Sequence, residues 1–404
     1  MSRLVFIVLC LISFLYQIFL NVLSRRSVKN PIPESVSDVY DEAEYLKWKQ
    51  YKNECVKFDL VTTIVSFVII AAMIGFNVFA VVPMLTRNQY LTTLYTILIF
   101  TLVTTVAGTV MNYYETFVIE EKFGFNKSTK KTFFVDTVKQ FVINLVIDCA
   151  LVFIIQLLYG AIGDYIILAF AAVLLIVILF VTLLVPYFSR LFNKFTPLEN
   201  RELEARIRGL LEKNGIRVRS ISVMNASLRT TKSNAYFAGM GKTKSIVLYD
   251  NLVNNFTDDE IVSVFAHEMG HAIHKDTTKN YFFSFGNVVV IVLAVWAMLK
   301  LNIYGDFGFD FINYGLTYVL TFNAILPILS PLMNLLSSLH SRSAEYKADA
   351  AAAKEGYGSA LISALKKLTK ENFADLSPDK TLVALTYSHP TIAQRIDAIE
   401  KNKD

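Results

Sequence analysis

Long runs of hydrophobic residues alternate along the chain with segments rich in charge. A run of about 20 apolar residues is the length that an α-helix needs to cross the hydrocarbon core of a bilayer. One such run also fits a buried core helix, but seven in one chain favour a polytopic membrane protein. We therefore predict seven spans, at about residues 4–23, 58–80, 91–112, 141–162, 165–188, 282–301 and 311–336.

The composition agrees with this prediction. Of the 404 residues, 54% are hydrophobic and only 18% are charged, a balance that is typical of membrane proteins and not of soluble ones of this size. The first run has Arg3 ahead of it, as a signal peptide would. It stays apolar to Leu23, however, and is followed by Arg25 and Arg26 instead of a small-residue cleavage site, so we expect a retained span.

The charges predict the orientation of these spans. Nearly every Lys and Arg lies in the four hydrophilic segments that seven spans place on one side of the membrane, at 24–57, 113–140, 189–281 and 337–404. The positive-inside rule puts this side in the cytoplasm or nucleoplasm and the N-terminus outside. The net charge of +5 gives no indication of nucleic-acid binding, because basic and acidic residues are interleaved. The three cysteines form neither a disulfide framework nor a metal pattern.

Several predicted spans carry polar residues. The third is rich in threonine, the fourth contains Asn144 and Asp148, and the seventh contains Asn313, Asn323 and Asn334. Polar groups are costly in hydrocarbon unless they face protein or water. Two interpretations stay open: hydrogen bonds within and between helices, and a water-filled cavity enclosed by the spans.

The segment 189–281 is the only long hydrophilic region between two spans. An apolar stripe that begins at Leu203 predicts an amphipathic helix that ends near Asn214-Gly215. Two short strands are predicted at 220–224 and 245–249. Thr257 and Glu260 then form the capping-box pattern that starts a second helix.

This second helix carries a His-Glu-x-x-His sequence, formed by His267, Glu268 and His271. Two histidines four residues apart lie on one helical face, where both can bind one metal ion. The adjacent carboxylate of Glu268 is placed to take a proton from a metal-activated water molecule. The pattern therefore predicts a catalytic Zn²⁺ site, one ion per chain.

A catalytic zinc ion commonly needs a third protein ligand. The best candidates follow the seventh span, where Glu345 and Asp349 are four residues apart on a predicted helix and Arg342 shares their face. The same trio also fits a solvated set of surface ion pairs. Spacing alone does not distinguish Glu345 from Asp349 as the ligand.

The chain resembles the type I CAAX prenyl proteases, a family of integral-membrane zinc metallopeptidases. The resemblance extends over most of the sequence, in an order that is highly specific. It rests on five segments: FVIEEKFGFNK at 117–127, LFNKFTPL at 191–198, SNAYF at 233–237, EYKAD at 345–349 and YSHP at 387–390.

The resemblance implies a role for each matched residue. His267, His271 and Glu345 would be the zinc ligands, and Glu268 the general base. Asp349 and Arg342 would lie around the ligands and orient them. The other implied residues are Asn234, Ala235 and Tyr236, which would bind the substrate backbone by strand addition, and His389 and Arg395, which would act on the scissile carbonyl or the substrate end.

The implied fold is mainly α: seven spans that enclose a chamber, with a small α+β zincin-like metalloprotease domain. Residues 1–188 would hold five spans and two cytoplasmic loops, and 189–281 the zinc protease segment. Residues 282–336 would hold the last two spans, and 337–404 the segment with the third ligand. After the zinc motif the chain has Ala272-Ile273 where the family often has Trp-Lys, which weakens any transfer of substrate preference.

The predicted function is cleavage of the C-terminal tripeptide from prenylated CAAX-type proteins or other membrane-associated peptides. The membrane would be the endoplasmic reticulum or inner nuclear membrane in a eukaryote, and the plasma membrane in a bacterium. One alternative is a general quality-control metalloprotease for membrane proteins. A more remote alternative is a seven-span transporter or receptor in which the metal motif is coincidental.

Overall fold

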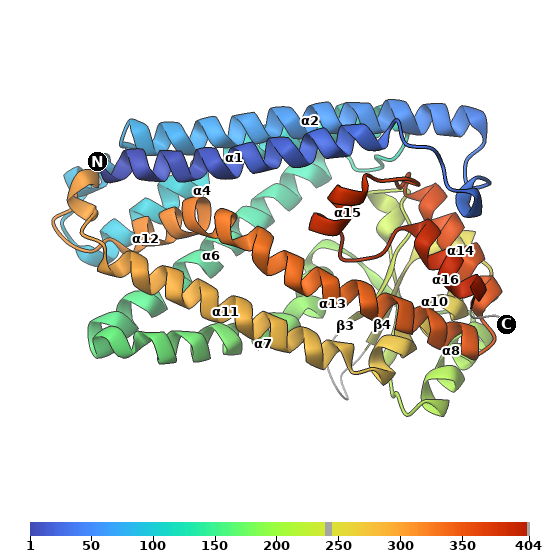
Figure 1. Ribbon diagram of the computed structural model, residues 1–404. Coiled ribbons are helices and arrows are strands. Elements are labelled where there is room, and N and C mark those ends of the chain that lie inside the picture. Colours follow the sequence, from blue (N-terminus) through green and yellow to red (C-terminus); the bar gives the residue numbers. More distant parts are fainter. Residues whose placement is uncertain (239–244, 402–404) are drawn as a thin grey trace.

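The computed structural model describes residues 1–238 and 245–401, apart from the side chains of 177–189, 237, 238 and 277. The protein is mainly helical. Long helices form a bundle at one end, and a small sheet with shorter helices lies at the other end (Figure 1). The N-terminus lies at the bundle end, far from the sheet (Figure 1).

Each predicted span falls on a long helix. These helices are α1 (Ser2–Ser27), α2 (Glu42–Gly75), α4 (Gln89–Tyr114), α6 (Lys130–Ile162), α7 (Ile166–Phe192), α11 (Asp276–Lys300) and the pair α12 (Tyr314–Leu320) and α13 (Leu326–Lys354). Within the described residues, six helical stretches are long and apolar enough to cross a membrane. One of them joins α6 to the start of α7, and the predicted span 165–188 reaches into side chains outside the description. The seven-span count stays a prediction.

The helix of the second predicted span ends earlier than its apolar run. The sequence predicts a span that reaches residue 80, but α2 ends at Gly75. Asn77 then adopts a left-handed conformation with φ 53°, which a continuing α-helix cannot accommodate. A short 3₁₀ turn (Val78–Val81) and helix α3 (Val82–Leu85) follow. The apolar run extends past the end of the helix, so the predicted end of this span at residue 80 is too late.

Hydrogen bonds satisfy polar residues near the start of α4, and a cavity lies further along the bundle. Near the start of α4, Thr96 donates to the carbonyl of Thr92, four residues earlier, and accepts from Asn313 at the start of α12. Further along, Thr105 and Thr109 of α4 and polar residues of α6 line a cavity of about 570 Å³. Near the N-terminal end of α4 the threonines therefore bond within their own helix and to Asn313, and a cavity opens toward its C-terminal end. A water-filled chamber enclosed by the spans stays a prediction.

A four-stranded mixed sheet lies at the other end of the molecule. Its strands are β1 (Phe195–Pro197), β2 (Ser220–Met224), β3 (Ala235–Ala238) and β4 (Ser245–Tyr249), in the order β1-β2-β4-β3. The two predicted strands, at 220–224 and 245–249, are confirmed and pair in parallel. Strand β3 is antiparallel to β4 and lies at an edge of the described sheet.

The sheet packs on helices that share one hydrophobic core. The predicted amphipathic helix is α8 (Arg201–Lys213), which buries Leu203, Ile207 and Leu211. Their neighbours come from β4, from α9 (Asp250–Asn255) and from the zinc-motif helix α10 (Asp258–Ile273). Phe265 of α10 is fully buried in this core. Because one face of α10 is held here, its opposite face is fixed toward α13 and the C-terminal segment.

Helix α10 begins as the sequence predicts. Thr257 accepts a hydrogen bond from the backbone N–H of Glu260, and the Glu260 carboxylate accepts from the N–H of Thr257 at 2.8 Å. This capping box is confirmed.

The C-terminal segment completes the domain with α14 (Gly358–Glu371), α15 (Lys380–Thr386) and α16 (Ile392–Lys401), which pack around α13 (Figure 1). The likeness of the domain to zincins stays a prediction.

Helices α10 and α13 cross at Gly270. A Cβ atom at this position would lie 2.6 Å from the Cα of Ala348 and 3.0 Å from its carbonyl oxygen. Such distances are far inside van der Waals contact, so only glycine permits this approach. Gly270 lies directly before His271, and Ala348 lies between Glu345 and Asp349 in the chain. The small residues therefore set the distance between the predicted zinc ligands.

We predict that Gly270→Ala forces the two helices apart, destabilises the fold by about 1–3 kcal/mol and reduces zinc binding. Thermal unfolding and metal content of the purified protein would measure both effects. Gly209→Ala is the matched control, because Gly209 lies in helix α8 with nothing within 4 Å of an added Cβ atom. Equal zinc content and stability in the Gly270 variant would contradict the importance of this contact.

Candidate active site

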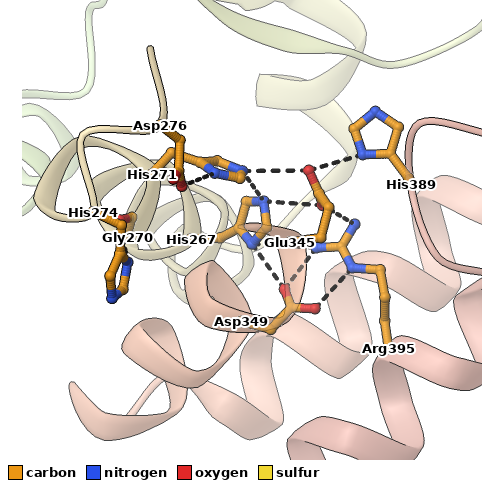
Figure 2. Close-up of polar contacts among 9 residues, drawn as sticks. All are labelled: His267, Gly270, His271, His274, Asp276, Glu345, Asp349, His389 and Arg395. Atoms are coloured by element: carbon orange, nitrogen blue, oxygen red, sulfur yellow. Dashed lines mark hydrogen bonds and ion pairs between the residues drawn. The ribbon is translucent and has the colours of Figure 1, made fainter. Parts of the chain in front are cut away.

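The side chains of His267 and His271 converge one turn apart on α10 (Figure 2). Their Nε2 atoms are 3.2 Å apart. The carboxylate of Glu345, on α13, faces both of them: Oε2 lies 3.5 Å from Nε2 of His267, and Oε1 lies 3.3 Å from Nε2 of His271. Ligand atoms of the three residues all lie within 4.8 Å of one another, the only such His/Cys/Asp/Glu group found within the described residues.

The opposite nitrogen of each ring contacts a buried carboxylate. Nδ1 of His267 lies 2.7 Å from Oδ1 of Asp349, and Nδ1 of His271 lies 3.2 Å from Oδ2 of Asp276. An ionised carboxylate only accepts, so each Nδ1 carries the proton and donates it. The lone pair of each ring is then on Nε2, where the two histidines and Glu345 face one another. This is the arrangement of a metal site.

Asp276 is a residue that the sequence analysis missed. It lies after the end of α10, where helical periodicity no longer relates it to His271. Lys275 adopts a left-handed conformation with φ 55° and turns the chain back, so that Asp276 begins α11 beside the histidine. Burial raises the pKa of Asp276, but hydrogen bonds from His271 and Lys279 hold it below its usual value. An acid three residues after the end of a His-Glu-x-x-His helix was the available signal.

Arg395, on α16, neutralises part of the negative charge of Asp349 and Glu345. Its Nε and Nη2 donate to the two oxygens of Asp349 at 2.9 and 2.6 Å, and its Nη1 lies 3.3 Å from Oε2 of Glu345 (Figure 2). Glu345 is only 3% exposed, and its Oε2 takes part in no hydrogen bond. An ionised oxygen at such a position is costly unless a cation neutralises it.

The charges of the site fit a divalent cation. Four carboxylates surround the histidines, those of Glu268, Asp276, Glu345 and Asp349, and two cations pair with them, Arg395 and Lys279. Neutral histidines leave two negative charges without a partner. The pKa of His271 shows the same excess: burial lowers it, but Glu345 and Asp276 raise it overall to about 9. The residues present therefore fit a bound zinc ion.

The site opens into a cavity of about 450 Å³. Glu268 lines its wall next to the two histidines, and His389 lines it from the segment before α16. Nδ1 of His389 lies 2.8 Å from Oε1 of Glu345, whereas the rest of its side chain is 63% exposed. The structure thus brings Glu268, His389 and Arg395 together with the three predicted ligands.

Arg342 lies apart from this cluster. Its guanidinium donates to the backbone carbonyls of Val383 and Tyr387, at 3.2 and 2.6 Å. These carbonyls belong to the end of α15, from which the chain continues to His389. In the described structure Arg342 therefore holds the segment that carries His389, and its role as an orienting residue stays a prediction.

The predicted substrate-binding residues lie at the start of the edge strand: Asn234 directly precedes it, and Ala235 and Tyr236 lie on its opposite faces. Asn234 and Ala235 line the cavity. Tyr236 packs instead with Met224 and Val247 on the other side of the sheet. The difference follows from the alternation of side chains along a strand. A substrate backbone that pairs with β3 would bond to the main chain of the strand, so it would not need all three side chains.

Comparison with known proteins identifies the family. Residues 197–403 match the family model described as "Peptidase family M48". Residues 20–194 match the model described as "CAAX prenyl protease N-terminal, five membrane helices". The chain belongs to peptidase family M48. It is a membrane metallopeptidase, and the resemblance seen in its sequence is confirmed.

Similar proteins cover nearly the whole chain. A CAAX prenyl protease 1 homolog of Arabidopsis thaliana is 29% identical over 96% of this chain and 95% of its own. A probable CAAX prenyl protease 1 of Schizosaccharomyces pombe is 33% identical over 72% of this chain, although the match spans only 61% of that relative. The crystal structure of S. mikatae Ste24p superposes with a TM-score of 0.91 at 27% identity, covering 98% of this chain and 99% of that one.

We predict that Asp276→Asn weakens zinc binding about 10- to 100-fold, because a neutral amide no longer fixes the His271 ring as firmly. Competition with a zinc-binding dye would measure the affinity. Asp259→Asn is the control, since Asp259 forms an exposed ion pair with Arg206 at the other end of α10. If both variants bound zinc as the unmodified protein does, the orienting role of Asp276 would be excluded.

Proposed function

We propose that this protein is a zinc-dependent membrane endopeptidase that removes the C-terminal tripeptide of prenylated CAAX-type proteins. The observation that carries this proposal is the convergence of His267, His271 and Glu345 on one cavity wall with Glu268. The cavity lies beside an edge strand at one end of a bundle of apolar helices. The names of the similar proteins support the substrate class.

In the proposed site His267, His271 and Glu345 hold the zinc ion, and Asp349 and Asp276 keep the two imidazoles oriented. When bound, the ion polarises the scissile carbonyl and makes an attacking water molecule more acidic. Arg395 keeps Asp349 and Glu345 ionised by pairing with both. The tight packing around these groups limits their movement before the reaction begins.

Glu268 acts as the general base in this proposal. It follows His267 directly in the chain and lines the same cavity, so its carboxylate is beside the reacting water. The carboxylate takes a proton from the water and later delivers it to the nitrogen of the leaving amine. His389 is exposed at the cavity wall and is placed to donate a hydrogen bond to the substrate carbonyl or its C-terminal end.

The substrate backbone binds to β3 in this proposal. The strand has β4 on one side and is an edge of the described sheet, so its other side can pair with an added strand. Asn234 and Ala235 place that side next to the metal ligands, within one cavity. Main-chain pairing would hold peptides of varied sequence, and the lipid would contribute the remaining affinity.

The lipid requirement follows from where the cavity lies. Helices α11 and α13 run from the apolar bundle to the site (Figure 1). Helix α11 begins at Asp276, beside His271, and α13 carries Glu345 along its length. A prenyl chain can therefore stay in apolar surroundings while the attached peptide reaches the zinc ion. We propose that the catalytic side faces the cytoplasm, as the positive-inside rule predicts, in the endoplasmic reticulum membrane.

We expect Glu345→Ala to reduce zinc from one ion per chain to nearly none, because it removes the only carboxylate that faces both Nε2 atoms in the described structure. Elemental analysis of purified protein would measure this. Glu355→Ala is the control, since Glu355 follows the end of the same helix and pairs with Lys213 on the surface. A full zinc complement in the Glu345 variant would remove it from the ligand set.

We expect Glu268→Gln to keep its zinc and to lower kcat by about 10²–10⁴-fold, the range attributed to a general base. Cleavage of a farnesylated peptide in proteoliposomes would measure the rate, with metal content determined on the same sample. Activity comparable to that of the unmodified protein would show that another group takes the proton.

A pair of substrates tests the substrate class. We expect the farnesylated peptide to be cleaved with a kcat/KM at least tenfold above that of the same peptide without its lipid. A misfolded membrane protein serves as the second comparison. Preferential cleavage of the misfolded protein would instead favour the quality-control function.

A further inference from the structure

A partly buried polar contact joins the membrane helices to the segment just before the strand that borders the active site. Nζ of Lys232 lies 3.3 Å from Oε2 of Glu120 and 3.3 Å from the hydroxyl of Tyr51. Tyr51 in turn donates to Oε1 of Glu120 at 2.6 Å. Glu120 is the last residue of the π-helical turn that follows α4, Tyr51 belongs to α2, and Lys232 lies two residues before Asn234.

The local structure directs Glu120 toward Lys232. Residues Glu115–Glu120 form a π-helical turn at the end of α4, and such wide turns rotate the side chains that follow them. The Lys232 ammonium also lies 5.1 Å from the ring centre of Phe125, which is itself buried. Ring and carboxylate together hold one cation in a partly buried position, where ion pairs are screened less than at the surface.

The backbone around Lys232 is held as well. Asn251 donates to the Lys232 carbonyl at 3.3 Å, and Asn372 donates to the Ser233 carbonyl at 3.3 Å. The Ser233 hydroxyl bonds to Glu371 at the end of α14. Strand β3 follows directly after these contacts, and it pairs with β4 in the described sheet. Its position relative to the metal ligands therefore depends on how its start is fixed.

We propose that Lys232 and Glu120 are positioning residues that set the place of β3, and so the binding of the substrate backbone. This inference rests on the proposed function, because it takes β3 as the strand to which the substrate adds. Neither residue lines the cavity or contacts a predicted zinc ligand in the described structure. Their effect is on binding, because a displaced strand pairs less well with the substrate backbone.

The test compares Lys232→Met, Glu120→Gln and the double variant in proteoliposomes, with a farnesylated peptide as substrate. Methionine keeps much of the lysine stem and removes the charge. Each single variant should raise KM about tenfold and leave kcat and zinc content within twofold of the unmodified protein. Because the two groups act as one contact, the double variant should be no worse than either single one. Lys232→Arg should restore KM, since it keeps the cation.

Lys122→Met is the matched control. Lys122 lies on the same segment as Glu120 and pairs with Glu54 at 3.2 Å, but both side chains are exposed. It should leave KM unchanged. An unchanged KM in the Lys232 and Glu120 variants would overturn the inference, and so would a parallel fall of kcat and zinc content, which marks general loss of structure. Absence of cleavage by the unmodified protein would instead overturn the proposed function itself.

Discussion

The site depends on the close crossing of α10 and α13. At Gly270 the helix surfaces approach so closely that a methyl group would overlap the backbone of Ala348. This contact brings a histidine pair from one helix to a carboxylate pair from the other, although 82 residues separate His267 from Asp349. Both helices are held from outside as well, α10 by the core around Phe265 and α13 by α14 and α16. Packing therefore places the metal ligands before any ion is bound.

This crossing concentrates negative charge in a space that water barely reaches. Asp349 is 1% exposed, Glu345 3% and Asp276 3%. Uncompensated, such a group of acids would destabilise the fold, because burying charge is expensive. Arg395 and Lys279 neutralise part of it, and a divalent ion neutralises the rest. In the proposed function, stability and catalysis would thus require the same cation.

Much of this arrangement could be predicted from the sequence, because its signals are local. The His-Glu-x-x-His spacing, the capping box of Thr257 and Glu260 and the strand at 245–249 each depend on residues close together in the chain. The partner of His271 could not be found in this way, since the left-handed Lys275 breaks the helical period before Asp276. Spacing left the choice between Glu345 and Asp349 open, since both lie on one helical face, and the family resemblance favoured Glu345. The contacts agree with that choice: Glu345 faces Nε2 of both histidines, and Asp349 faces Nδ1 of His267.

The helix that carries Glu345 also belongs to the membrane bundle, and its irregularities are unevenly placed. The π-helical turn at Thr321–Ile325 and the proline at Pro331 lie in its apolar part. From Pro331 to Glu345 the helix continues unbroken for roughly 20 Å, at 1.5 Å per residue. Breaks of this kind are where helices bend. The span is thus irregular in its apolar part and a regular α-helix where it approaches the site. A bend at these breaks would therefore lie in the apolar part of the span, well before the stretch that carries Glu345 to the histidines.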